Sequence, residues 1–400
     1  MKSVRPLCLA TLAGLSVLTS CQGEATEEST ATGVTETETA DTTDPETTAG
    51  ICNESDIPLG EGYPAPEADC PDTLSDTASD IQQGFVNTGL AGMALRAELL
   101  DPNNINVILC GTGTPVPSNR AQACTAVFVA GKFFLFDAGD GASRSAEGLN
   151  LPLADLGALF LTHFHSDHIA GVGEIMSRSW ILGRDTPLTI YGGQGVERIV
   201  TGFNHIYALD DAYREAHHGP THFPIEFAPG ETGLIPNPGA AGQVVYEKDG
   251  VRVLAFSVDH SPIEPALGYR VEYMGKVVGI SGDTIATEGL TNLARDADVL
   301  VSEVMNKAWI EETECALRAL PPAARGADIF RDIRNYHIDV AELGQAANDA
   351  GVQTLVLTHM VPTPVDAAQA DTLFVAPISE TFSGTLEVGD DGDRITIPLN

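Results

Sequence analysis

The chain has 400 residues, 43% hydrophobic and 19% charged, so it can bury one large core or two smaller ones. Its formal net charge of −35 at pH 7 argues against a surface that neutralises many nucleic-acid phosphates. A small anionic substrate is compatible with this charge, because a bound metal ion can dominate the local field. We therefore expect a small-molecule substrate and no nucleic-acid partner.

The first 20 residues have the pattern of a signal peptide rather than of a folded segment. After a basic start, the apolar stretch 7–18 is too short to span a bilayer as a stable helix. It leads into Leu-Thr-Ser-Cys at 18–21, which resembles the lipobox of bacterial lipoproteins. The resemblance implies export, lipid attachment at Cys21 and membrane contact through that lipid, with an ordinary secretory signal as the alternative. Gln22 fits sorting to the outer membrane if the source is Gram-negative.

Residues 21–50 are rich in Thr and Glu, with eight acidic residues and no basic ones. Such a segment cannot bury enough apolar surface to fold, so we expect a solvated tether. We place an N-terminal extension at 51–100 and the main folded domain at 101–400.

Five cysteines follow Cys21, and export would permit disulfides among them. Cys52 with Cys70 would close a Pro- and Gly-rich stretch. Cys110 with Cys124 would join two neighbouring strands across the loop between them. Cys315 would then stay unpaired, although sequence alone does not prove this connectivity.

Apolar runs and periodicity predict the regular elements in chain order. Strands are expected at 105–110, 125–129, 132–136, 156–161, 188–191, 251–258, 268–273, 276–281, 299–301 and 354–358. Helices are expected at 81–100, 170–182, 194–207, 338–350 and 366–375. Strand groups separated by helices, repeated in two halves, favour two sheets packed face to face with helices outside. The irregular stretch 208–248 is expected to be a surface loop, with a lid over the substrate as the alternative.

The most informative segment is Thr-His-Phe-His-Ser-Asp-His at 162–168, directly after the predicted strand 156–161. On an extended segment His163, His165 and Asp167 point to one side, because side chains alternate along a strand. His168 follows where a helix is expected to begin. Imidazole nitrogens suit zinc, and a nearby carboxylate can bind a second metal ion. The segment therefore predicts a metal site rather than a histidine-rich polar loop.

Four further polar residues stand at the ends of predicted elements. His260, Asp283 and His359 each follow a strand, and His337 precedes a helix. Individually each is typical of a cap or of a satisfied buried group. Together they provide the ligands that would complete two metal shells.

These motifs resemble the metallo-β-lactamase superfamily, specifically its ribonuclease Z-like branch, over residues 106–362. The matching motifs are Gly-Thr-Gly-Thr-Pro at 111–115, Phe-Asp-Ala-Gly-Asp-Gly at 136–141, the segment 162–168, Ser-Gly-Asp-Thr at 281–284 and Thr-His-Met-Val-Pro at 358–362. The resemblance implies a four-layer αββα sandwich for the domain at 101–400. It also implies two zinc ions, with Mn²⁺ or Fe²⁺ as alternatives.

The resemblance further implies a role for each matching residue. One ion would be held by His163, His165 and His260, and the other by Asp167, His168 and His359, with Asp283 bridging both. Asp137 would support these ligands from outside the first shell. His337 would donate a proton or stabilise an oxyanion, Glu303 would orient it, and Asp167 would also accept the proton of the attacking water.

Within the superfamily, the best-known zinc β-lactamases have a cysteine where this chain has Asp283, which argues against that activity. Ribonuclease Z carries a long tRNA-binding arm between the residues that match His260 and Asp283. Only 23 positions separate these two residues here, which argues against transfer-RNA processing. The remaining features resemble the arylsulfatase-like group. We therefore expect an exported, lipid-anchored dinuclear hydrolase that cleaves small sulfate or phosphate esters. The alternatives are a phosphodiesterase for cyclic nucleotides or small diesters, a lactone hydrolase, and a surface-binding protein with a relic site.

Overall fold

The computed structural model describes residues 76–399. The predicted signal peptide, the lipid site at Cys21, the tether and the pairing of Cys52 with Cys70 lie outside these residues. Among the described residues, no helix has both the length and the apolar character that crossing a membrane requires.

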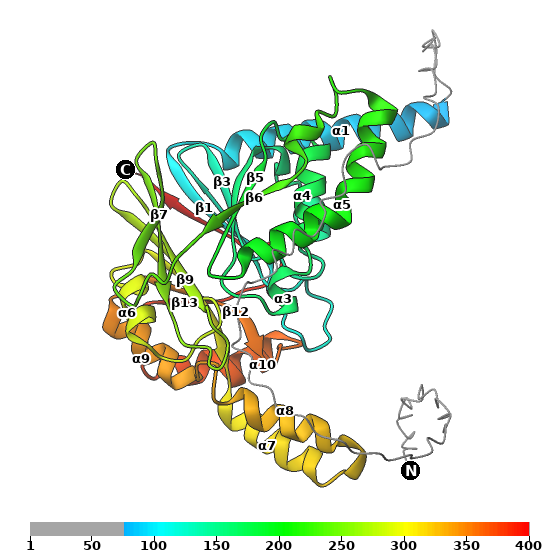
Figure 1. Cartoon of the computed structure of the whole chain (residues 1–400). Helices are drawn as coiled ribbons and strands as arrows, with labels where there is room; N and C mark the ends of the chain where they lie inside the picture. The colour runs from blue at the N-terminus through cyan, green and yellow to red at the C-terminus, as the bar shows by residue number, and fades with distance from the viewer. Residues whose placement is uncertain (1–75, 400) are drawn as a thin grey trace, which may run out of the picture. The chain divides into compact units, whose positions relative to one another are not determined.

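Two seven-stranded sheets form the centre of the body (Figure 1). In spatial order the first sheet contains β14 (Arg394–Pro398), β1 (Asn104–Gly111), β2 (Cys124–Val129), β3 (Lys132–Phe136), β4 (Leu156–Phe160), β5 (Leu188–Gly192) and β6 (Gly230–Leu234). The second contains β13 (Thr385–Val388), β12 (Thr354–Val361), β11 (Val299–Met305), β10 (Lys276–Ile280), β9 (Leu267–Tyr273), β8 (Val251–Ser257) and β7 (Gln243–Lys248). Each sheet combines parallel and antiparallel pairs.

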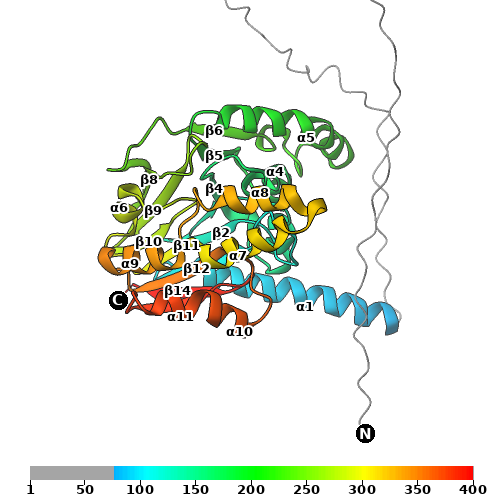
Figure 2. The same cartoon turned by 90° about the horizontal axis from the view of Figure 1, so that it is seen from below.

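Helices cover the outer faces of both sheets (Figures 1 and 2). The helices before β6 are α1 (Asp76–Leu99), α2 (Ala142–Gly148), α3 (Ser166–Ile169), α4 (Val172–Ile181) and α5 (Val196–His218). The later helices are α6 (Glu288–Ala294), α7 (Lys307–Arg318), α8 (Ala324–Ile333), α9 (Val340–Ala350), α10 (Ala367–Ala370) and α11 (Ala376–Ser379). Helices α2, α4 and α5 accompany the first sheet, and α6 and α9 pack on the second.

Three apolar cores separate four layers, which confirms the predicted sandwich. The central core lies between the sheets, where Phe136 and Phe160 of the first sheet pack against Tyr269 of the second. A second core joins the first sheet to α4, and a third joins the second sheet to α9. Strands buried on both faces need near-continuous apolar runs, which explains why sequence patterns located them.

The stretch 208–248 differs from the expected surface loop. Helix α5 extends to His218, and β6 and β7 then form an edge of each sheet. Their burial is weak, as expected for edge strands, so neither has the strong apolar run from which the other strands were predicted. The chain thus passes from the first sheet to the second within this stretch.

The disulfide between Cys110 and Cys124 confirms one predicted pairing. It joins the end of β1 to the start of β2, with a Cα–Cα distance of 5.0 Å, and closes the segment between them. Cys315 is exposed on α7 and forms no disulfide among the described residues, as predicted.

Candidate metal centre

The segment 162–168 leaves the end of β4 at the edge of the first sheet and enters the short helix α3. His163 and His165 lie before the helix, and their ring nitrogens meet as strand alternation predicts. Asp167 lies within α3 and joins His168 instead. Helical geometry begins at Ser166, so the strand alternation from which Asp167 was placed does not extend to it, although its carboxylate still lies near His165.

Three histidines from the two sheets form the first cluster. The Nε2 atom of His163 lies 2.9 Å from Nδ1 of His165, and Nε2 of His260 lies 3.3 Å from that same Nδ1. The main-chain oxygen of Tyr336 accepts a hydrogen bond from Nδ1 of His260 at 2.8 Å, which leaves Nε2 free to bind a metal ion. Burial lowers the pKa of all three histidines and favours their neutral, metal-binding form.

The second cluster contains Asp167, His168 and His359. Nε2 of His359 lies 3.1 Å from Oδ2 of Asp167, and Nε2 of His168 lies 3.5 Å from the same oxygen. Burial opposes a charge on both histidines, yet neighbouring carboxylates, chiefly Asp283, raise the pKa of each. Burial likewise opposes ionisation of Asp167, but the two histidines outweigh it and lower its pKa. The carboxylates thus attract positive charge to this cluster, which a bound metal ion would supply in place of the histidine protons.

Asp283 lies between the two clusters. Its Oδ2 atom is 3.9 Å from Nε2 of both His163 and His260, 3.4 Å from Nε2 of His168 and 3.7 Å from Nε2 of His359. Burial raises the pKa of Asp283, but the facing histidines, chiefly His359 and His168, outweigh burial and bring the pKa well below its usual value. One ionised oxygen therefore faces both clusters, which is the arrangement required of a bridging ligand.

A buried ion pair stands beside these clusters. Nδ1 of His337 lies 2.9 Å from Oε2 of Glu303, whose other oxygen accepts a hydrogen bond from the Thr284 backbone at 2.9 Å. Burial lowers the pKa of His337, but the charge of Glu303 and its hydrogen bond outweigh this and raise the pKa to about 9. His337 is thus protonated at neutral pH, with its ring centroid 5.1 Å from that of His260 and 5.8 Å from that of His359.

Asp137, at the end of β3, holds the ligand segment in place. Its carboxylate accepts hydrogen bonds from the backbone and hydroxyl of Thr162, both at 2.8 Å, and binds Nδ1 of His168 at 2.8 Å. A carboxylate behind a histidine fixes the tautomer and orients the other nitrogen toward the metal position.

The donor atoms fit divalent metal ions. Nε2 of His168, which faces Asp167 and Asp283, is buried and has no hydrogen-bond partner among the described residues. A cavity of about 30 Å³ is lined by His168, His359 and Asp283, which is room for roughly one water-sized species. Neutral imidazoles and ionised carboxylates are the ligands that zinc prefers.

The structure thus brings together every residue predicted for the site. Sequence reasoning missed the supporting groups: the Thr162 hydroxyl, the Thr284 amide and the Tyr336 carbonyl. Two of these are backbone atoms, which no residue type could indicate. Thr162 begins the histidine-rich segment, so its position was the one available signal.

Comparison with known proteins identifies the family. Residues 133–360 match the model of the Beta-lactamase superfamily domain. The chain is 36% identical to ribonuclease Z of Mycolicibacterium paratuberculosis over 297 residues, covering 73% of this chain and 98% of that protein. It is 34% identical to ribonuclease Z of Mycobacterium bovis with the same coverage. The short form of human tRNase Z has a similar fold, with a TM-score of 0.52 and 18% identity over 73% of this chain and 99% of that chain.

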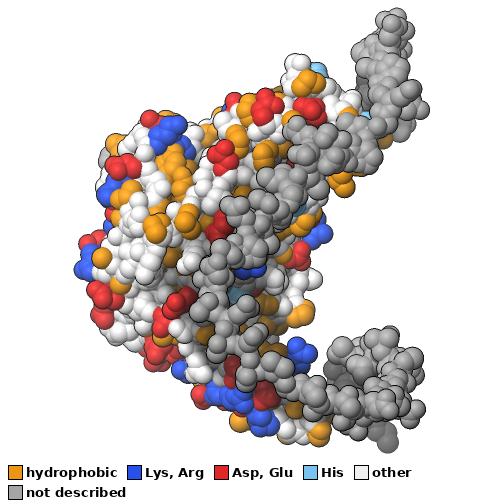
Figure 3. Space-filling view, viewed as in Figure 1, with side chains coloured by type: hydrophobic (Ala, Val, Ile, Leu, Met, Phe, Trp, Pro, Cys, Tyr) orange, Lys and Arg blue, Asp and Glu red, His pale blue; other side chains and the backbone are white. Residues whose placement is uncertain are grey.

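These relatives overturn the expectation that no nucleic acid is a partner, because they are ribonucleases. That expectation was based on net charge, which describes the whole surface and not the potential at one site, where a bound metal ion can be the largest local charge. Acidic and basic side chains are also interspersed on the visible face in Figure 3, so net charge is a weak guide to any one region. The chain belongs to the metallo-β-lactamase superfamily and, within it, to the ribonuclease Z-like branch.

Proposed function

We propose that this protein is a metal-dependent phosphodiesterase that cleaves RNA. The observation that carries the proposal is the pair of ligand clusters on either side of Asp283, with the protonated His337 beside them. Within the proposal, the ligands are His163, His165 and His260 at one ion and Asp167, His168 and His359 at the other. Asp283 is shared, and zinc is the metal.

Two divalent ions bound by these ligands would supply an activated water and would stabilise charge on a phosphoryl group. The chain's own residues supply the proton transfers. Asp167, which its lowered pKa keeps ionised, would accept the proton of the attacking water. His337, whose pKa of about 9 keeps it protonated, donates a proton to the leaving oxygen. Glu303 keeps the His337 ring aimed at the site through their 2.9 Å contact.

The family relationship supports RNA as the substrate class. The two ribonuclease Z relatives align over nearly their whole length, so the likeness includes more than the metal-binding motifs. A sulfate ester is the second candidate, because the same in-line displacement would serve it and the sequence resembles the arylsulfatase-like group. No described contact favours sulfate over a phosphodiester.

A substrate comparison tests the proposal. Metal-free protein loaded with Zn²⁺ would be given a structured RNA with a 3′ extension, bis-nitrophenyl phosphate and nitrophenyl sulfate. We expect cleavage of the RNA and of the phosphate diester, and little release from the sulfate. Asp167→Ala should abolish turnover, whereas His205→Ala, at an exposed histidine of α5, should leave it unchanged. Intact RNA together with rapid sulfate cleavage would reject RNA as the substrate and favour the second candidate.

A further inference from the structure

The turn 389–393 passes from β13 in the second sheet to β14 in the first. The Gly389 amide donates a hydrogen bond to the Leu357 oxygen of β12 at 2.9 Å, and the Gly392 amide donates one to the Leu109 oxygen of β1 at 2.7 Å. The turn therefore connects the two sheets close to the strand ends that carry the candidate metal centre. It also lies outside the stretch that matches the family model.

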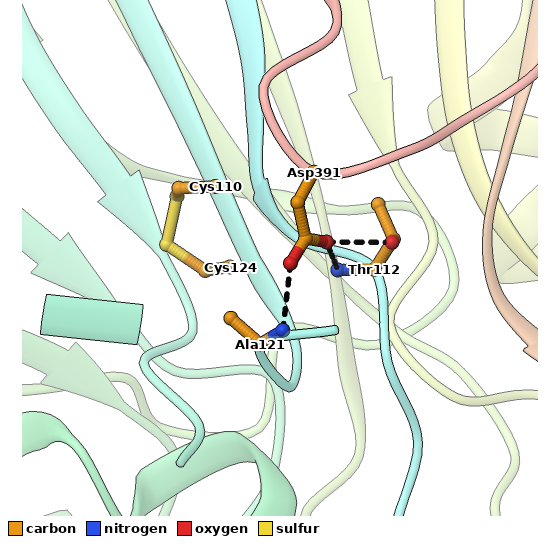
Figure 4. Close-up of a disulfide and its surroundings, with 5 residues drawn as sticks. All are labelled: Cys110, Thr112, Ala121, Cys124 and Asp391. Atoms are coloured by element: carbon orange, nitrogen blue, oxygen red, sulfur yellow. Dashed lines mark hydrogen bonds between the residues drawn. A yellow bond between two sulfur atoms is a disulfide. The ribbon is translucent and has the colours of Figure 1, made fainter. Parts of the chain in front are cut away.

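Asp391, in this turn, binds both ends of the segment 112–121 (Figure 4). One carboxylate oxygen accepts hydrogen bonds from the Thr112 backbone at 2.9 Å and from the Thr112 hydroxyl at 2.7 Å. The other oxygen accepts one from the Ala121 backbone at 2.6 Å. Three hydrogen bonds to one carboxylate are stronger than the same bonds to a neutral acceptor, so Thr112 is held firmly.

Thr112 in turn holds His359. The pairing of β11 with β12 shifts register between Thr358 and Met360, so His359 occupies a bulge and has a positive φ of 45°. Its amide donates instead to the Thr112 oxygen of the opposite sheet at 3.1 Å. A buried amide that lost this acceptor would cost about 1–3 kcal/mol. The orientation of His359 therefore depends on the position of Thr112.

We propose that Asp391 is a positioning residue of the metal centre, which acts through Thr112 to fix His359. The inference rests on the proposed function, because it assigns His359 to a metal ion. Asp391 joins the ligand that comes from the second sheet to the backbone of the first. The Cys110–Cys124 disulfide closes the same segment independently (Figure 4), so the segment stays attached when the carboxylate is changed.

The test is Asp391→Asn, which keeps the shape of the side chain but turns one acceptor into a donor. Asp185→Asn is the control, since Asp185 is exposed and its carboxylate has no hydrogen bond or ion pair among the described residues. The primary readout is Zn²⁺ affinity at each site, measured by competition with a chromophoric chelator. We expect Asp391→Asn to bind one of the two ions about 10- to 100-fold more weakly, as for other outer-shell partners of metal ligands. The other ion and the control should be unchanged.

A second readout separates positioning from a general structural effect. Excess Zn²⁺ should restore activity to Asp391→Asn but not to Asp167→Ala, which lacks a ligand. If Asp391→Asn does not fold, Thr112→Val should weaken the same site and Thr112→Ser, which keeps the hydroxyl, should not. Parent-like Zn²⁺ affinity at both sites in folded Asp391→Asn, or in Thr112→Val, would overturn the inference. A parent protein that neither binds Zn²⁺ nor cleaves phosphodiesters would instead overturn the proposed function.

Discussion

Replacing His337 by alanine should lower the rate in proportion to how much the leaving group needs a proton. The pKa of about 9 means that roughly 99% of His337 carries its proton at pH 7. An alkyl phosphodiester releases a strongly basic alkoxide, so the loss of this donor should lower kcat by about 10²–10⁴-fold, or about 2.7–5.5 kcal/mol of transition-state stabilisation. Nitrophenolate leaves readily without a proton, so bis-nitrophenyl phosphate should lose less than about tenfold.

The assay measures kcat for an alkyl phosphodiester and for bis-nitrophenyl phosphate, each with zinc-loaded parent protein and with zinc-loaded His337→Ala protein. Zinc content measured on both proteins ensures that metal loss does not cause the difference. His205→Ala is the matched control, because it replaces an exposed histidine on α5. Equal losses on the two substrates, with zinc retained, would show that His337 does not protonate the leaving group and would refute this reasoning.

Three further predictions concern groups around the centre. Glu303→Gln removes the charge that raises the pKa of His337 to about 9. In a pH–rate profile, the fall in alkyl-diester activity at high pH should therefore begin at a lower pH than in the parent protein. A fall at the same pH in both proteins would contradict this. Asp137→Asn should weaken Zn²⁺ binding by about 10- to 100-fold, measured by chelator competition, because the carboxylate orients a histidine ligand. Replacing Cys110 and Cys124 by serine should cost about 3 kcal/mol of unfolding free energy in a urea titration, given the 14-residue separation; an unchanged midpoint would contradict this.

The pH dependence of stability follows from the buried ion pair between His337 and Glu303. The raised pKa of His337 means that the folded state binds its proton more tightly than the unfolded state. The difference between about 9 and the ordinary value of 6.5 corresponds to about 3 kcal/mol. This contribution is fully present below about pH 6.5 and is lost as pH rises through about 9.

Local patterns predicted two packed sheets and polar residues at the strand ends, and the resemblance to the metallo-β-lactamase superfamily implied the four-layer sandwich and the role of each site residue. Strands such as β4 and β12 are buried on both faces and therefore carry continuous apolar runs. Most ligands come directly after a strand, so the predicted strand ends indicated where the ligands lie. His359 is the exception in detail: it lies within β12 at a bulge, which residue types do not reveal.

Contacts between distant segments could not be predicted from sequence. The edge strands β6 and β7 lack a strong apolar run, and only the sheets that they complete identify them. The link from Asp391 through Thr112 to His359 joins residues 279 and then 247 positions apart, one step of it through backbone atoms. The expectation of no nucleic-acid partner was wrong because it rested on net charge, which describes the whole surface and not one site on it.

The most direct test of the central claim is RNA cleavage measured as Zn²⁺ is titrated into metal-free protein. With two ligand clusters sharing Asp283, the account predicts that cleavage rises with added zinc and reaches a plateau at two equivalents. RNA that stays intact at every ratio, or a plateau already complete without added metal, would contradict it.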